Sequence, residues 1–201
     1  MNEELNSFEK NEVSIGAQVW MVKNLNVEKF RSGDAIKEVK TNEEWEKAGE
    51  NCEPAWCYYE NDPSNGEKYG KIYNGYAVTD ARGLAPNGWH VPSDIEWTNL
   101  SKFLGGEKVA GIKMKSTIEW EVHPIPAARK NGTNESGFTA LPGGYRNNDG
   151  TFGGVGKDCS LWSSTDMFGR LDLRAMDYVE SCLMKSSLSK SYGFYVRCLK
   201  D

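Results

Sequence analysis

Polar and hydrophobic positions largely alternate along two segments in the second half of the chain, which is typical of strands buried on one face. These segments are residues 170–179, RLDLRAMDYV, and residues 191–200, SYGFYVRCLK, and we expect a strand in each. Residues 15–30 mix β-branched and aromatic residues, which favours one or two strands near the amino terminus. Between residues 135 and 165 short apolar pieces are separated by glycines, which indicates short strands joined by tight turns.

Two segments of the first half have the pattern of helices instead. Residues 41–50, TNEEWEKAGE, are helix formers that follow a capping residue at Thr41 or Asn42. Residues 60–71, ENDPSNGEKYGK, are so rich in Asn, Pro, Ser and Gly that they predict a surface loop, and residues 72–89 predict a short helix that runs into a loop. Helices in the first half and strands in the second indicate an α+β fold with a mainly antiparallel sheet.

The second helix should begin at the stretch GWHVPSDIEW, residues 88–97. Ser93 and Glu96 have the S-x-x-E spacing of a capping box, and Asp94 would lie in the first turn, where the helix dipole favours a negative charge. Apolar residues then recur on one helical face until a Gly-Gly pair, namely Trp97, Leu100 and Leu104. We therefore assign Asp94 and Glu96 to helix capping and not to acid–base chemistry.

Composition and charge exclude several classes of protein. The 201 residues carry a net charge of −5, which argues against binding to nucleic acid. No apolar run approaches the ~18 residues of a membrane-spanning helix. Residues 1–12 are polar, lack the features of a signal peptide and predict a flexible segment. The chain is therefore either cytoplasmic or the mature part of an exported protein.

Recognisable catalytic chemistry is absent from the sequence. His90 and His123 are the two histidines, and their spacing does not form a zinc motif, so the role of His90 stays open. No nucleophile motif, Walker loop or dinucleotide fingerprint occurs, and we do not expect an enzyme. The chain also has five cysteines, an odd number without a C-x-x-C pair, which leaves one or two disulfides and buried free thiols as alternatives: Cys52, Cys57, Cys159, Cys182 and Cys198.

Aromatic and amide-rich segments provide the candidate binding residues. In the sequence AWCYY, Trp56 and Tyr58 would share one face of a strand while Tyr59 takes the other, and flat aromatic rings can stack on sugars. The turn NNDGTFGG supplies oxygen atoms that hard cations prefer, but it lacks the motif of a calcium loop, so calcium is conceivable and no cofactor is expected. The candidate ligand-binding residues are therefore Trp56, Tyr58, Tyr59, Arg146, Asn147 and Asp149.

Several separated motifs, in order along the chain, resemble a known family. The sequences GWHVPSDIEWTNL, ESGFTALPGGYRNNDGTF, LWSSTD and GFYVRCLKD together resemble the Fibrobacter succinogenes major paralogous domain, over about residues 13–201. The resemblance implies a single domain over residues 13–201, in an exported or cell-surface protein of Bacteroidetes-type bacteria. It implies no established activity.

A second resemblance adds an expected fold. VPSDIEW and GFYVRC are similar to the helix start and the closing strand of the formylglycine-generating enzyme and sulfatase-modifying group. This implies a C-type-lectin-like fold, in which early and late strands meet and long loops rich in Gly and Asn carry binding. We therefore expect a non-catalytic binding or adhesion module for a carbohydrate or protein ligand. The alternatives are a copper-dependent cysteine oxidase that uses Cys159 with Cys182 or Cys198, and a surface spacer without a ligand.

Overall fold

The computed structural model describes residues 11–122, 124 and 132–201. The predicted flexible segment 1–12 lies outside the described residues except for its last two, of which Glu12 already belongs to a strand. His123 also lies outside them. Within the described part the fold is α+β, with short helices on mixed and mostly antiparallel sheets, as the order of the sequence patterns predicted.

The first 114 residues carry the helices together with short strands. Its elements are β1 (Glu12–Ile15), β2 (Gln18–Met21), β3 (Lys37–Glu38), α1 (Asn42–Glu50), β4 (Ala55–Cys57), the 3₁₀ helix η1 (Tyr59–Asn61), α2 (Pro63–Tyr69), β5 (Ile72–Asn74), α3 (Gly75–Val78), β6 (Trp89–His90), α4 (Asp94–Phe103) and α5 (Glu107–Met114). The described residues after Met114 contribute strands alone: β7 (Gly143–Arg146), β8 (Phe152–Val155), β9 (Asp158–Met167), β10 (Arg170–Asp177), β11 (Met184–Ser189), β12 (Gly193–Phe194) and β13 (Leu199–Lys200).

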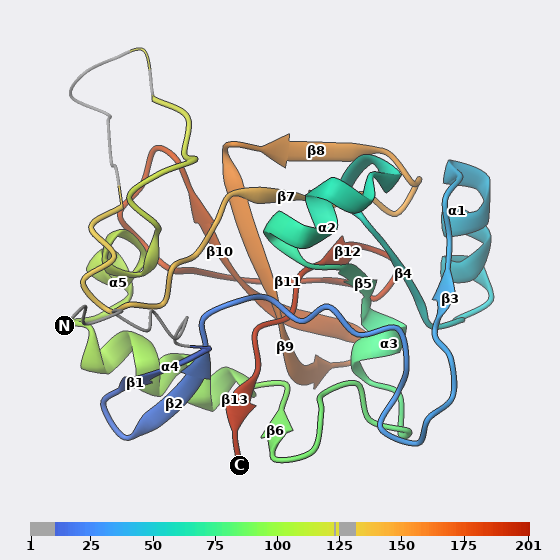
Figure 1. Cartoon of the computed structure of the whole chain (residues 1–201), viewed down its shortest axis with the longest axis horizontal. Helices are drawn as coiled ribbons and strands as arrows, with labels where there is room; N and C mark the ends of the chain where they lie inside the picture. The colour runs from blue at the N-terminus through green and yellow to red at the C-terminus, as the bar shows by residue number, and fades with distance from the viewer. Residues whose placement is uncertain (1–10, 123, 125–131) are drawn as a thin grey trace, which may run out of the picture.

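Two sheets organise the described residues. One has four strands in the order β1-β2-β13-β6, so that the last strand of the chain lies between strands from its first half (Figure 1). The other has nine strands in the order β11-β10-β9-β7-β12-β5-β4-β3, with β8 paired to β7. Parallel pairing in this sheet joins β3 to β4 and β7 to β9. In Figure 1, α1 lies at one end of the molecule, and α4, α5 and the β1–β2 hairpin lie at the other.

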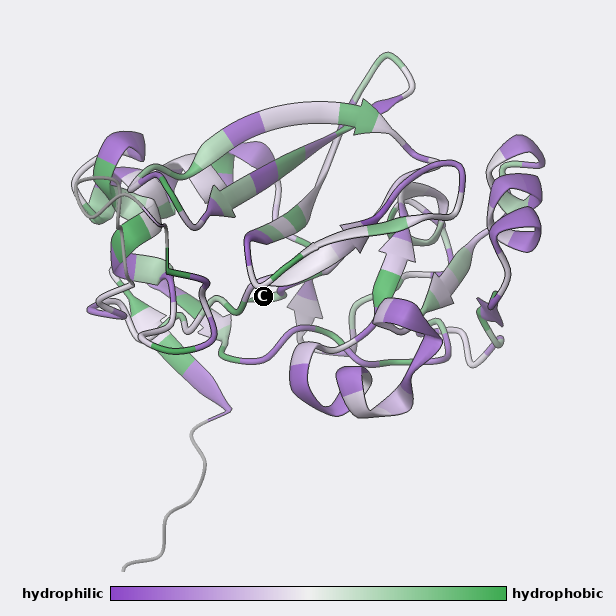
Figure 2. Cartoon of the chain, turned by 90° about the horizontal axis from the view of Figure 1, so that it is seen from above, coloured by the Kyte–Doolittle hydropathy of each residue, from purple (hydrophilic) through white to green (hydrophobic). Residues whose placement is uncertain are grey.

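The predicted helix starts are confirmed. Thr41 caps α1 and Ser93 caps α4, each in a complete capping box with the glutamate three residues later. Trp97 and Leu100 face the core, where Trp97 lies 4.7 Å from Trp20 of β2 between ring centroids. The outer face of α1 is hydrophilic (Figure 2), so the core contacts of this helix run along one side.

Other expectations of local structure were wrong or incomplete. Residues 60–71 contain the helix α2 instead of a loop only, because the Asp62 carboxylate accepts a hydrogen bond from the Ser64 N–H and Pro63 suits the first helical position. Residues 191–200 form two short strands, since the chain passes from one sheet to the other between them. Strand β10 is buried on both faces and not on one. The helix α5 was not predicted.

The β1–β2 hairpin packs tightly on α4. Its turn begins at Gly16, which has a φ of +63°, and a Cβ atom there would lie 2.9 Å from Cδ2 of Phe103. Phe103 is 65% exposed, and the covered part of its ring packs against the turn of the hairpin. Glycine is required at this position both for the backbone conformation and for the close approach of the ring.

Candidate functional site

A groove crosses one face of the large sheet. On β10, Leu173 and Ala175 point to this face, and their partners across the sheet are Ser186 of β11 and Ser160 of β9. Side chains at alternate positions share a face, so Arg174 points to the opposite side. The groove encloses about 310 Å³, which is at the lower end of small-molecule sites.

Aromatic rings form the wall of this groove at its β7–β12 side. Tyr192 stacks on Phe194 with ring centroids 6.2 Å apart and planes inclined by 7°, and Tyr145 lies 6.1 Å from Phe194. Phe194 is buried and contacts Trp162 beneath it at 4.7 Å, whereas Tyr145 and Tyr192 are partly exposed. The buried ring therefore supports two tyrosines that remain accessible to a ligand.

The polar groups of the groove are neutral. Asn147, Ser160 and Ser186 contribute an amide and two hydroxyl groups, and none of the described residues that line the groove is charged. Asn147 is held in place because its Nδ2 donates a hydrogen bond to Oγ1 of Thr151 at 3.0 Å. Apolar walls with a few fixed polar groups are typical of sites for small uncharged ligands.

The predicted aromatic candidates lie away from the groove. Trp56 is buried, and its Nε1 donates to the carbonyl of Ile36 at 3.0 Å. Tyr58 packs edge-to-face on Trp56 at 5.2 Å, and Lys71 places its ammonium 4.5 Å from the Trp56 ring centre. The hydrophobic core has two clusters of buried side chains. Trp56 and Tyr58 pack in one of them and Tyr59 packs in the other, so the alternation along this segment is as predicted. Ligand binding by these three rings stays a prediction.

The candidates at the end of β7 and on the turn after it lie in three different settings. Arg146 is buried and donates hydrogen bonds to the carbonyls of Val39, Thr41 and Gly150, which uses all three guanidinium nitrogens inside the protein. Asp149 is exposed, and its Oδ1 accepts hydrogen bonds from Thr151. Asn147 alone of the three lines the groove.

His90 does have partners, although none was visible in the sequence. Its Nε2 lies 2.9 Å from Oε1 of Glu96, and its Nδ1 lies 2.8 Å from Oδ1 of Asp201. Partial burial of the imidazole lowers its pKa, but the hydrogen bonds to Asp201 and Glu96 outweigh this and raise the pKa above its usual value. Both ring nitrogens are occupied, so the cluster ties β6 to α4 and to the end of β13.

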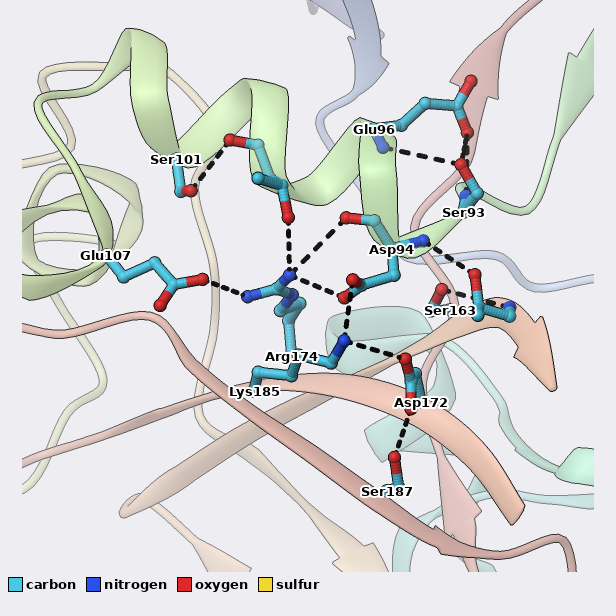
Figure 3. A network of polar contacts seen from close by, with 12 residues as sticks. Ser93, Asp94, Glu96, Ser101, Glu107, Ser163, Asp172, Arg174, Lys185 and Ser187 are labelled. Carbon is cyan, nitrogen blue, oxygen red and sulfur yellow. Dashed lines mark hydrogen bonds and ion pairs between the residues drawn. The ribbon is translucent and has the colours of Figure 1, made fainter. Parts of the chain in front are cut away.

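Asp94 joins a network of charges on the sheet face opposite the groove (Figure 3). Its two carboxylate oxygens contact Arg174 Nη2 at 2.6 Å and Lys185 Nζ at 2.7 Å. Arg174 also contacts Glu107 at 2.8 Å, and Lys185 contacts Asp172 at 3.2 Å. This network, which sequence reasoning missed because its members are far apart in the chain, holds the start of α4 against β10 and β11.

All five cysteines are free thiols in the structure. Burial raises the pKa of the thiols of Cys57, Cys159 and Cys198 to about 12, which disfavours the thiolate. Among the described residues no group of three His, Cys, Asp or Glu side chains is arranged to hold a metal ion. The copper site on Cys159 stays a prediction that metal analysis would test.

Comparison with known proteins identifies the family of the chain. The model of the Fibrobacter succinogenes major domain matches residues 13–200. The chain belongs to this family. No curated protein and no solved structure matches the chain significantly. No helix among the described residues is long and apolar enough to cross a membrane.

Proposed function

We propose that this Fibrobacter succinogenes major domain is a non-catalytic binding module that holds a neutral sugar in the groove over β9, β10 and β11. The observation that carries the proposal is the pair of accessible tyrosines, Tyr145 and Tyr192, fixed by the buried Phe194. A sugar ring presents apolar C–H faces to aromatic rings and hydroxyl groups to amides and hydroxyls, and the groove offers both kinds of partner.

The absence of charged side chains among the described lining residues favours a neutral sugar over a charged ligand. A charged ligand buried without a partner of opposite charge would lose its hydration without compensation, and the groove offers it no such partner. Its volume of about 310 Å³ suits one or two sugar rings better than a folded partner protein, which needs a wide contact surface.

The fold and location expected from sequence form part of the same proposal. A C-type-lectin-like architecture is supported by the pairing of β13 with β2, which places a late strand beside an early one. A place outside the cell, at the bacterial surface, is what the resemblance to the Fibrobacter succinogenes major paralogous domain implies, and it belongs to the same proposal. A binding module there would present the groove to external glycans.

A glycan array probed with the full chain and three variants tests the proposal. We expect a neutral glycan to bind the wild type, with Tyr192→Ala and Tyr145→Ala weakening binding up to about tenfold, the scale of one lost aromatic contact. Tyr58→Ala is the matched control, because Tyr58 is another partly exposed tyrosine and lies outside the groove. Thermal unfolding of each variant reports whether it is folded.

Two results would overturn the sugar site. One is a wild-type protein that binds no glycan, as a spacer domain would. The other is binding that Tyr58→Ala weakens and Tyr192→Ala leaves unchanged, which would move the site to the aromatic cluster at Trp56 and Tyr58.

A further inference from the structure

A second cavity, separate from the groove, is lined by cationic side chains. It encloses about 170 Å³ between the segment after β2, the helix α2 and the segment before β13. These three segments contribute Lys23, Lys68 and Arg197, and none of the described residues that line the cavity is acidic. The groove and this cavity share no lining residue.

Arg197 differs from the other two buried arginines in its partners. Arg174 forms ion pairs with Asp94 and Glu107, and Arg146 donates from all three nitrogens to carbonyl groups. Arg197 is 1% exposed and, like Arg146, forms no ion pair with any described residue. A buried guanidinium without a counter-charge is costly, so what matters is whether each of its nitrogens has an acceptor, as each nitrogen of Arg146 does.

The hydrogen bonds of Arg197 leave one nitrogen available. Nε donates to Oδ1 of Asn24 at 2.9 Å, and Nη1 donates to the carbonyls of Met21 and Phe138 at 3.1 and 2.6 Å. Nη2 has no hydrogen-bond partner among the described residues, and Arg197 lines the cavity. Burial lowers the pKa of Arg197 to about 10, which still leaves it charged at neutral pH. The remaining donor therefore carries a positive charge at the cavity wall.

We propose that this cavity binds an oxyanion, a phosphate or sulfate group, against Arg197 and Lys68. These two cationic groups match a doubly charged anion such as sulfate better than a singly charged carboxylate such as acetate. The volume is below that of sites for drug-sized ligands and suits a group of this size. An anion here would supply the counter-charge that Arg197 lacks.

Glu119 modulates the site from outside. Its carboxylate contacts Nζ of Lys68, which is 41% exposed, and so competes with an anion for that ammonium group. Removal of the Glu119 charge should strengthen anion binding, and removal of the Lys68 charge should weaken it. General attraction to surface charge would give the same two signs, so a lysine that does not line the cavity is the control that separates it from a specific site.

Isothermal titration of the full chain with potassium phosphate and sulfate, at constant ionic strength set with chloride, tests the proposal. We expect both anions to bind, Lys68→Gln to weaken binding about tenfold, as for a lost charge-assisted hydrogen bond, and Glu119→Gln to strengthen it. Lys47→Gln, an exposed lysine on α1, is the control that should change nothing. A sulfated monosaccharide in the same series distinguishes a free ion from a group on a larger ligand.

Three outcomes would overturn the site. They are the absence of binding by both anions, equal affinities in the wild type and in Lys68→Gln, and acetate binding as tightly as sulfate. Arg197→Lys, which keeps the charge but loses the fixed donors, should bind more weakly if it folds, and the two surface variants decide the question if it does not.

Discussion

The imidazole Nδ1 of His90 lies 2.8 Å from Oδ1 of Asp201, while its Nε2 lies 2.9 Å from Oε1 of Glu96. A histidine between two carboxylates is stabilised in its protonated form. Its raised pKa in the folded state means that this contribution to stability is complete below the unfolded value of 6.5 and is lost as the pH rises through the folded value.

A pH dependence follows for a variant at this position. The destabilisation caused by His90→Gln should be larger at about pH 5.5 than at about pH 8.5, by less than ~1 kcal/mol because the cluster is partly exposed. The pKa of Glu96 is lowered, despite partial burial, by its hydrogen bonds to Ser93 and His90, so its own contribution disappears only at lower pH. Urea unfolding at both pH values measures the difference, and an equal loss at both would contradict the assignment.

Within the charge network at the start of α4, loss of the buried member, Arg174, should destabilise the protein most. Arg174 is fully buried between Asp94 and Glu107, and Arg174→Ala should cost roughly 3–5 kcal/mol of the free energy of unfolding. Lys185 is 45% exposed, and Lys185→Ala should cost about 2 kcal/mol less than the arginine variant. Denaturant titrations of both proteins check this order, and a larger loss in Lys185→Ala would contradict the expectation that the buried ion pairs of Arg174 contribute most.

The tip of the β9–β10 hairpin should accept a stabilising substitution. Phe168 is fully exposed and has a φ of 55°, a left-handed conformation that is unfavourable for a phenylalanine and favourable for an asparagine before a glycine. Phe168→Asn should raise the free energy of unfolding by about 0.5–1 kcal/mol. Thermal unfolding would show it, with Met167→Asn at the neighbouring position as the control, and a loss of stability would argue that the ring has packing partners.

The thiols should differ strongly in reactivity. Cys52 is exposed, whereas Cys57, Cys159 and Cys198 are buried with pKa values raised to about 12. Iodoacetamide at neutral pH should therefore alkylate Cys52 in the native protein and reach the three buried thiols only after denaturation. Mass spectrometry of the digested protein gives the order, and rapid native labelling of Cys159 would contradict the structure.

Local signals in the sequence predicted the parts of this fold that depend on neighbours in the chain. The cap at Thr41, the capping box at Ser93 and the alternation of residues 170–179 are of this kind, and each corresponds to an element. The helix α2 was missed because capping by Asp62 and Pro63 outweighs the poor helix propensity of the residues that follow. The capping signal was present in the sequence, but the low helix propensity of the segment led to the prediction of a loop.

Long-range contacts explain what the sequence could not show. Tyr145 and Tyr192 reach the same groove only because β12 pairs beside β7, and nothing in either segment indicates that pairing. Asn147 was predicted from its turn, and its place in the groove depends on the same pairing. The ion pair of Asp94 with Arg174 joins residues 80 positions apart, so a motif search reads Asp94 only as a helix cap.

The central claim is that the groove beside Tyr192 is the binding site. An NMR titration of the isotopically labelled chain with the neutral glycan that binds best on the array tests it most directly. We predict that the backbone amide signals of Asn147, Ser186 and Tyr192 shift together and saturate with one affinity, while those of Trp56 and Tyr58 stay in place. Shifts confined to Trp56 and Tyr58, or no saturable shifts at all, would contradict the claim.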